Sequence, residues 1–127
     1  MITDPKEIDQ ILRSMIKEHI GPLQIRKDEA TVLEVAGTIP TMQGKQKVDG
    51  FYFASVMPKP KDVRLYFFPI YTDPEFFKDI APELRKCLKG KSCFHIKKID
   101  NNLTTHITNM ISLGIKTYQD KGLLITL

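Results

Sequence analysis

The residues best suited to chemistry gather in one stretch, Pro82–Asp100, whose sequence is PELRKCLKGKSCFHIKKID. It holds both cysteines, one of the three histidines, and six basic side chains against two acids. Its local charge of +4 equals the formal net charge of the whole 127-residue chain. Such a concentration of cations bears on association with anions and not on the fold. An anionic partner is therefore the first hypothesis for this stretch.

Cys87, Cys93 and His95 form the nearest approach to a set of metal ligands. Cys93 and His95 are two residues apart in an expected strand, so their side chains share a face. Structural zinc requires four protein ligands, and strong cysteine signatures come as pairs of the CxxC type. The other histidines, His19 and His106, lie far along the chain in expected helices. We therefore expect no metal and no cofactor.

Gly90-Lys91-Ser92 resembles the end of a phosphate-binding loop, but Arg85 stands where that loop requires a glycine. A helix is expected before the motif and a strand after it, which reverses the order of such a loop. The turn still offers a lysine, a hydroxyl and backbone amides, which suffice for a modest anion site. The predicted ligand surface consists of Tyr71, Lys91, Ser92 and His95.

Catalysis by a cysteine would need a neighbouring base and a lowered thiol pKa. Cys93 has His95 and Lys91 on its own strand face, which would favour the thiolate. Side chains two apart on a strand rarely reach hydrogen-bond distance, however, and no third member or oxyanion hole stands out. No pair of carboxylates suggests acid–base work either. The sequence therefore favours a non-enzymatic binding protein for a small anionic ligand.

Seven aromatic residues crowd two expected strands, and alternation divides them between the two faces of the sheet. If one face is open, the exposed rings and nearby cations would form a stacking platform for single-stranded nucleic acid. Burial of the rings in the core is the alternative that we favour, so nucleic acid is not the expected partner. One set is Phe51, Phe53, Phe67 and Tyr71, the other is Tyr52, Tyr66 and Phe68, and the cations are Arg64, Lys97 and Lys98.

Helices are expected at both ends of the chain. Asp4 and Pro5 form a cap-and-proline start, and apolar residues then recur at helical spacing until Gly21-Pro22. Asp100 caps a final helix that ends before Gly122. Each helix has one apolar face, which must pack against another layer. The inward residues are Ile8, Ile11, Leu12, Met15 and Ile16 in the first helix, and Leu103, Ile107, Met110, Ile111 and Tyr118 in the last.

Five segments between these helices have strand character. Pro69 lacks a donor, so it should lie at an edge or a bulge near the end of its strand. The stretch 37–50 is expected to be a loop with room for a short strand. Short helices should begin at Pro74 and at Pro82, the second with Leu84, Cys87 and Leu88 on one face. The expected strands are 23–27, 31–36, 51–57, 63–71 and 92–99.

This α-β-β-β-β-α-β-α order predicts an α+β two-layer sandwich around a mostly antiparallel sheet of about five strands. The length suits one domain, residues 1–127, and the composition of 42% hydrophobic and 27% charged residues is that of a globular protein. No apolar run approaches the twenty or so residues of a membrane span. Acids in MITDPKEID replace the basic and apolar parts of a signal peptide. We therefore expect a cytoplasmic protein with free thiols and no membrane partner.

The segments FFPIYTDPE and PELRKCLKGKSCFHIKK resemble the YdhG-like domain-of-unknown-function family. The shared pattern is a strand ending in Pro-x-Tyr, a proline-initiated helix, Pro-Glu-Leu, a basic helix and Gly-Lys-Ser-Cys-Phe. The resemblance covers most of the chain and is specific in residues 67–98. It implies a small bacterial α+β protein with a single domain and no assigned activity.

One branch of that family is described as frataxin-like, an intracellular iron chaperone. The resemblance then implies an iron site at an acidic ridge on the first helix and the first strand. This is the first alternative function, and nucleic-acid binding is the second. The acids of the first helix are Asp4, Glu7, Asp9 and Glu18, and they are interleaved with Lys6, Arg13 and Lys17.

Overall fold

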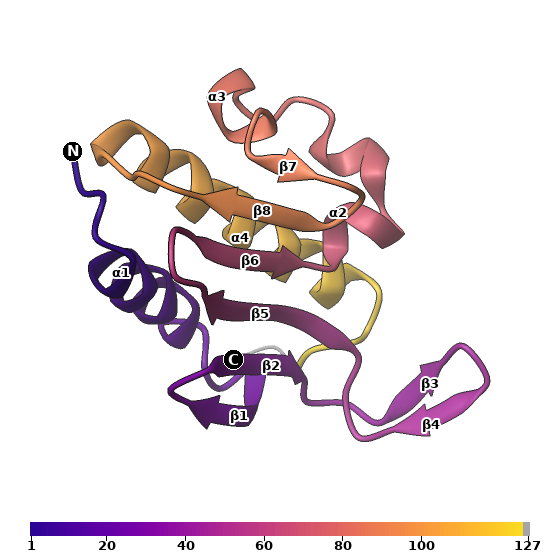
Figure 1. Cartoon of the computed structure of the whole chain (residues 1–127). Helices are drawn as coiled ribbons and strands as arrows, with labels where there is room; N and C mark the ends of the chain where they lie inside the picture. The colour runs from indigo at the N-terminus through magenta and orange to yellow at the C-terminus, as the bar shows by residue number, and fades with distance from the viewer. Residues whose placement is uncertain (126–127) are drawn as a thin grey trace.

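The computed structural model describes residues 1–125 and has an α+β architecture in two layers (Figure 1). One layer is a six-stranded sheet with the order β1-β2-β5-β6-β8-β7, in which every named pair is antiparallel. The predicted fold class is confirmed, with one strand more than expected in this sheet. Its strands are β1 (Leu23–Glu29), β2 (Val32–Gly37), β5 (Tyr52–Pro58), β6 (Val63–Phe67), β7 (Leu88–Lys89) and β8 (Cys93–Ile96).

The second layer contains the two long helices, both on one face of the sheet (Figure 1). The caps predicted from the sequence are present: Asp4 Oδ1 accepts a hydrogen bond from the Lys6 amide at 3.1 Å, and Asp100 Oδ1 accepts one from the Leu103 amide at 2.8 Å. The helices are α1 (Pro5–Lys17), α2 (Pro69–Thr72), the 3₁₀ helix η1 (Pro74–Phe77), α3 (Pro82–Arg85) and α4 (Asn101–Asp120).

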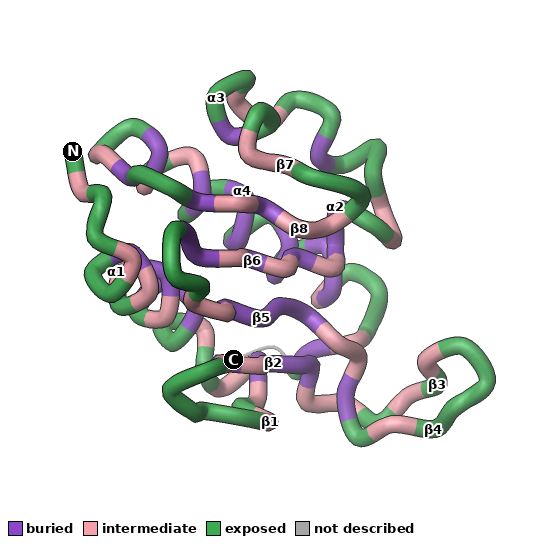
Figure 2. Tube along the Cα trace, in the orientation of Figure 1, coloured by how far each residue is buried: buried purple, intermediate pink, exposed green. Residues whose placement is uncertain are grey.

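One hydrophobic cluster joins α1, the inner face of the sheet and α4. At its centre the rings of Phe53, Phe67 and Tyr118 are fully buried and meet edge to face, with centroids 5.2–5.5 Å apart. Gly114 allows α4 to approach these rings, because a Cβ at this position would lie 2.6 Å from Phe67 Cζ. Figure 2 shows this burial along β5, β6 and the inner side of α4.

The structure differs from the expected boundaries at several places, among them β8, which ends at Ile96 and not at Ile99. α1 ends at Lys17, before the expected stop at Gly21-Pro22. The His19 and Ile20 amides donate to carbonyls three residues earlier, which tightens the chain before it turns into β1. β6 ends at Phe67, and Pro69 takes the first position of α2, where its missing N–H costs nothing. Leu88, expected on a helical face, lies in β7.

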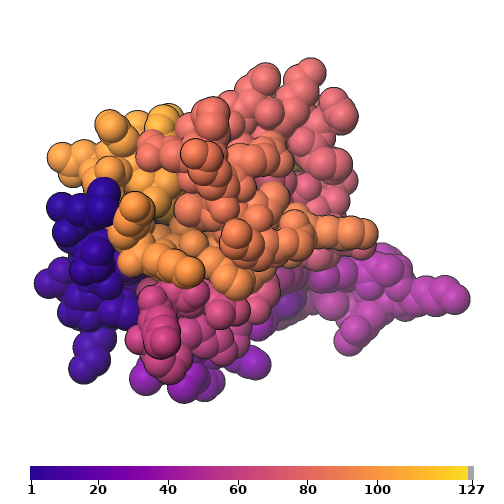
Figure 3. All heavy atoms as spheres, turned by 45° about the horizontal axis from the view of Figure 1, so that its top comes forward, coloured from indigo at the N-terminus to yellow at the C-terminus, as the bar shows by residue number. Residues whose placement is uncertain are grey.

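The stretch 37–50 contains a two-stranded hairpin, β3 (Thr41–Gln43) and β4 (Gln46–Val48), which stands away from the main sheet (Figures 1 and 3). The Gln43 side chain ties it to β5 by accepting a hydrogen bond from the Tyr52 amide at 3.3 Å. Within residues 1–125, none of the helices combines the length and the apolarity that a membrane crossing requires.

The other face of the main sheet has no helix on it (Figure 1). Burial alternates along β6 and β8, so Leu65 and Phe94 point into the core while their neighbours Tyr66 and Cys93 are half-buried. We call this second surface the open face. Cross-strand pairing aligns Glu34, Ser55, Tyr66 and Cys93 in one row across it.

Candidate functional site

The basic stretch folds around a cleft of about 430 Å³, which we call the basic cleft. Lys86 follows α3, Lys89 lies in β7, and Lys97 and Lys98 follow β8. The cleft therefore lies where α3, the β7–β8 hairpin and the start of α4 meet. The residues that matter for its chemistry are Lys86, Cys87, Lys89, His95, Lys97 and Lys98.

Backbone pairing holds the two sides of the basic cleft together. The His95 amide donates to the Cys87 carbonyl at 2.9 Å, which extends the β7–β8 hairpin by one pairing. Gly90 makes the turn between the strands with a φ of 80°, a conformation that favours glycine. Backbone hydrogen bonds therefore fix the positions from which the lysines on both sides of the hairpin extend.

Two charged side chains of α3 hold this helix to its neighbours η1 and α4, and neither of them pairs with a lysine of the basic cleft. Arg85 Nη2 donates to the Phe77 carbonyl at 2.6 Å, so this arginine serves the fold. Glu83 Oε1 lies 3.0 Å from His106 Nε2 of α4. Leu84 is fully buried beneath them. Because Arg85 and Glu83 bind neighbouring elements, neither is available to a ligand without breaking an existing contact.

The charge of the basic cleft is unbalanced. None of its four lysines forms an ion pair with any residue in the described part of the chain. Two acids also line the cleft, but Glu83 faces His106 and Asp100 caps α4. Within residues 1–125 the cleft thus presents four lysines with no carboxylate at ion-pair distance and a surplus of positive over negative side chains, which is the electrostatic character of an anion site.

His95 lies on the open face at the edge of this cleft, opposite Arg64 of β6. Arg64 Nε binds Asp62 Oδ1 at 2.9 Å, while Asp62 Oδ2 is 3.9 Å from His95 Nδ1. Burial, with the Arg64 charge as the second cause, lowers the pKa of His95. The fold therefore disfavours the charged imidazole, whereas a bound anion nearby would raise its pKa.

The two thiols are free, and neither is activated. Burial raises the pKa of Cys87, although Lys89 opposes the effect. Burial also raises the pKa of Cys93, although the nearby Tyr66 hydroxyl and Arg64 charge oppose the effect. The thiolate that the sequence suggested for Cys93 is therefore not favoured in this fold. Residues 1–125 also contain no group of three or more His, Cys, Asp or Glu side chains placed to hold a metal ion.

The four site residues predicted from the sequence divide between two places. Lys91 Nζ lies 5.7 Å from the centroid of the Tyr71 ring, a cation–π contact at the β7–β8 turn. Ser92 is next to Lys91 and is half-buried, and its carbonyl accepts a hydrogen bond from the Phe67 amide at 2.8 Å. His95 lines the basic cleft, whereas the other three residues do not. The sequence did not indicate Lys86, Lys89, Lys97 and Lys98 as one site, although their charge was visible in it.

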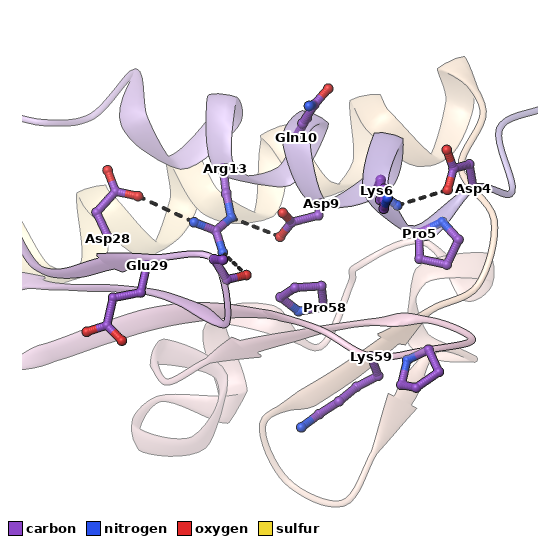
Figure 4. A pocket seen from close by; sticks show the side chains of 12 residues that line it. Asp4, Pro5, Lys6, Asp9, Gln10, Arg13, Asp28, Glu29, Pro58 and Lys59 are labelled. Carbon is purple, nitrogen blue, oxygen red and sulfur yellow. Dashed lines mark hydrogen bonds and ion pairs between the residues drawn. The ribbon is translucent and has the colours of Figure 1, made fainter.

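A larger groove of about 760 Å³ lies between α1 and the β1–β2 and β5–β6 turns (Figure 4). It collects acids of the first helix and the first strand, where the family resemblance places iron. Arg13 lies between two of them, with Nε 2.9 Å from Asp9 Oδ1 and Nη1 3.4 Å from Asp28 Oδ1. Lys17 Nζ is 2.8 Å from Asp28 Oδ2, and this contact lowers the pKa of Asp28. A cation entering here would have to displace these ion pairs.

Comparison of the chain with protein-family models, curated proteins and solved structures gives no match.

Proposed function

We propose that the protein is a non-enzymatic binding module that holds an anionic ligand in the basic cleft. The observation that carries this proposal is the contrast inside the cleft, where four lysines have no ion-pair partner within residues 1–125 while Glu83 and Asp100 are engaged elsewhere. A ligand with several negatively charged oxygens would form charge-assisted hydrogen bonds with these lysines. The raised pKa of both thiols supports binding over cysteine catalysis.

The size of the basic cleft favours a small phosphorylated molecule or one segment of a longer polyanion. Its volume of about 430 Å³ falls within the range of ordinary ligand sites. The free thiols support a cytoplasmic location for this activity. Membership of the YdhG-like family stays a prediction, and the segment that carries the resemblance contains most of the cleft.

Titration calorimetry with inorganic pyrophosphate at low ionic strength tests the proposal. We expect saturable binding by the wild-type protein. The double variant Lys89→Glu/Lys98→Glu should weaken it by roughly tenfold or more, since each lost charge-assisted bond contributes about 1.5–3 kcal/mol. The control is Lys45→Glu/Lys47→Glu on the β3–β4 hairpin, which makes the same change in net charge at two exposed lysines. The control should retain the wild-type affinity.

Three results would contradict this placement of the site. The wild-type protein could fail to bind pyrophosphate, or both double variants could lose affinity equally, in which case net charge alone would matter. Alternatively, Lys91→Glu could lose affinity for pyrophosphate while Lys89→Glu/Lys98→Glu retains it. That result would move the site to the β7–β8 turn, where the sequence first suggested it. Circular dichroism of each variant confirms that a lost affinity does not reflect unfolding.

A further inference from the structure

A cluster of contacting aromatic rings reaches the surface at one end of the β7–β8 hairpin. Phe68 is its centre, with ring centroids 5.8 Å from Phe51, 5.4 Å from Tyr52 and 5.4 Å from Tyr71. Tyr71 is 49% exposed, whereas the other three rings are half-buried. The end of β6 at Phe67 and the start of α2 at Pro69 produce this placement, because a continuing strand would have put Tyr71 in phase with Phe67. Tyr71 thus presents a ring that is already held in place by its neighbours.

Cations continue from this ring toward the basic cleft. Lys91 contacts Tyr71 at the turn, Lys89 follows on β7, and Lys97 lies beyond the end of β8. Lys91 and Lys97 flank β8 and are six residues apart, so at about 3.3 Å per strand residue they are separated by at most about 20 Å. Figure 3 shows the orange segment that includes β8 crossing the middle of one molecular face without being covered by other segments. The ring and the lysines therefore follow the β7–β8 hairpin, which forms this edge of the sheet.

Tyr71, Lys91 and the basic cleft together extend over more surface than a small anion can contact. Pyrophosphate would occupy the cleft and leave Tyr71 and Lys91 without a ligand. A ligand that used both ends would need negative charges spaced along a flexible backbone and a planar group free to stack. Single-stranded nucleic acid has both properties, and proteins bind it through basic grooves that track the backbone and aromatic rings that stack with bases.

We propose that the anionic ligand is a single-stranded nucleic acid, with its phosphates along Lys91, Lys89 and the basic cleft and with a base stacked on Tyr71. The inference rests on the proposed function and adds the ligand class to it. A duplex is a poorer fit because its bases are already stacked on one another and are not available to Tyr71. An acidic peptide would neutralise the lysines but would not engage the ring.

Fluorescence anisotropy with labelled oligothymidylate and oligouridylate of about ten nucleotides tests the inference, since this length lies within the site sizes of such proteins. With five lysines engaged, the slope of log K against log salt should be about −3.5, from about −0.7 per neutralised phosphate. Tyr71→Ala should weaken binding by roughly 5- to 150-fold, the range that corresponds to the loss of one stacked base. Tyr71→Phe should retain the wild-type affinity.

Matched controls separate stacking from charge and from folding. Phe76→Ala removes another exposed ring, on η1, and should leave oligonucleotide affinity unchanged. Tyr71→Ala should leave pyrophosphate binding in the cleft unchanged, which also reports that the variant is folded. A duplex of the same sequence should bind more weakly than the single strand.

These binding experiments can support or overturn the nucleic-acid inference separately from the proposed function. Equal affinity for duplex and single strand, an unaltered affinity in Tyr71→Ala, or equally tight binding of polyglutamate would overturn the nucleic-acid inference. If pyrophosphate binds in a cleft-dependent manner and no oligonucleotide does, the proposed function stands and this inference fails. If neither probe binds, both fail. Preference for RNA or for DNA would support the inference and identify which sugar the site accepts.

Discussion

Two tyrosines connect the last helix to the centre of the sheet. The Tyr118 hydroxyl donates to the Tyr52 carbonyl at 2.6 Å, and the Tyr52 hydroxyl lies 2.6 Å from Ser55 Oγ. Burial raises the pKa of Tyr52 to about 12 and also raises the pKa of Tyr118. Both side chains therefore remain neutral in the folded protein at a pH where they would ionise in the unfolded chain.

Tyr118→Phe tests this arrangement. At neutral pH we expect a loss of about 1–2 kcal/mol of unfolding free energy, because the partly buried Tyr52 carbonyl loses a partner. Above about pH 10 the unfolded state releases protons that the native state keeps, so stability falls with pH by up to about 1.4 kcal/mol per pH unit for each tyrosine. The variant should show a shallower fall than the wild type in urea unfolding between about pH 8 and pH 11. Tyr71→Phe, at an exposed ring, is the control, and an unaltered slope in Tyr118→Phe would contradict the assignment.

At the scale of elements, α4 depends on a close approach to β5 and β6. Gly114 faces Phe67 and Phe53, and both rings are fully buried and confined by other rings. A methyl group here would have to move Phe67, which packs edge to face with Phe77 on its other side. The glycine is therefore required by packing and not by backbone conformation.

Gly114→Ala should consequently destabilise the protein, although alanine is the better helix former. The gain in helix propensity is about 1 kcal/mol, and the cost of overpacking is about 1–3 kcal/mol, so we expect a net loss near 1 kcal/mol and a lower melting temperature. Ser112→Ala, at an exposed position of the same helix, should be neutral or slightly stabilising. A rise in melting temperature for Gly114→Ala would show that the core has room for the methyl group.

The sequence located the elements that depend on local signals and missed those that depend on pairing. Asp4 and Asp100 cap the two long helices as predicted, because a cap and an apolar stripe lie within a few residues. Leu88 was expected in a helix, and only its pairing with Phe94 makes it a strand residue. Pro69 was expected at an edge or a bulge near the end of its strand, whereas the structure places it at the first position of α2.

The candidate site was partly visible for the same reason. Charge is a property of each residue, so the basic stretch could be identified directly. Which lysines share a cleft depends on the β7–β8 hairpin, which turns at Gly90 and brings Cys87 opposite His95. The sequence grouped Tyr71 and Lys91 with His95, whereas in the fold Tyr71 and Lys91 meet at the β7–β8 turn and His95 lines the basic cleft.

At the scale of the whole molecule, the lysines of the basic cleft and the acids of the groove differ in whether they have ion-pair partners. The basic cleft keeps its lysines unpaired within the described residues 1–125, whereas the acids Asp9 and Asp28 of the groove in Figure 4 are held by Arg13 and Lys17. The molecule therefore exposes uncompensated cations and neutralises part of its acidic surface. This pattern favours an anionic ligand over a metal cargo.

Anaerobic titration with ferrous iron tests this distribution, and with it the iron-chaperone alternative. We expect no saturable micromolar site in the wild-type protein, because two carboxylates of the groove already have cationic partners. Arg13→Gln, which releases Asp9 and loosens Asp28, should be the first variant to gain affinity. Stoichiometric binding by the wild type that is lost on Asp9→Asn would instead restore the iron-chaperone function.

The alternation of burial along β6 and β8 has a consequence for how the protein can change over evolutionary time. Every second residue of these strands, such as Leu65 or Phe94, is fixed by the core, while its neighbours Tyr66, Cys93 and His95 are not. Substitutions at these half-buried positions therefore meet fewer packing constraints than substitutions in the core. The open face can therefore vary in sequence while the scaffold stays the same.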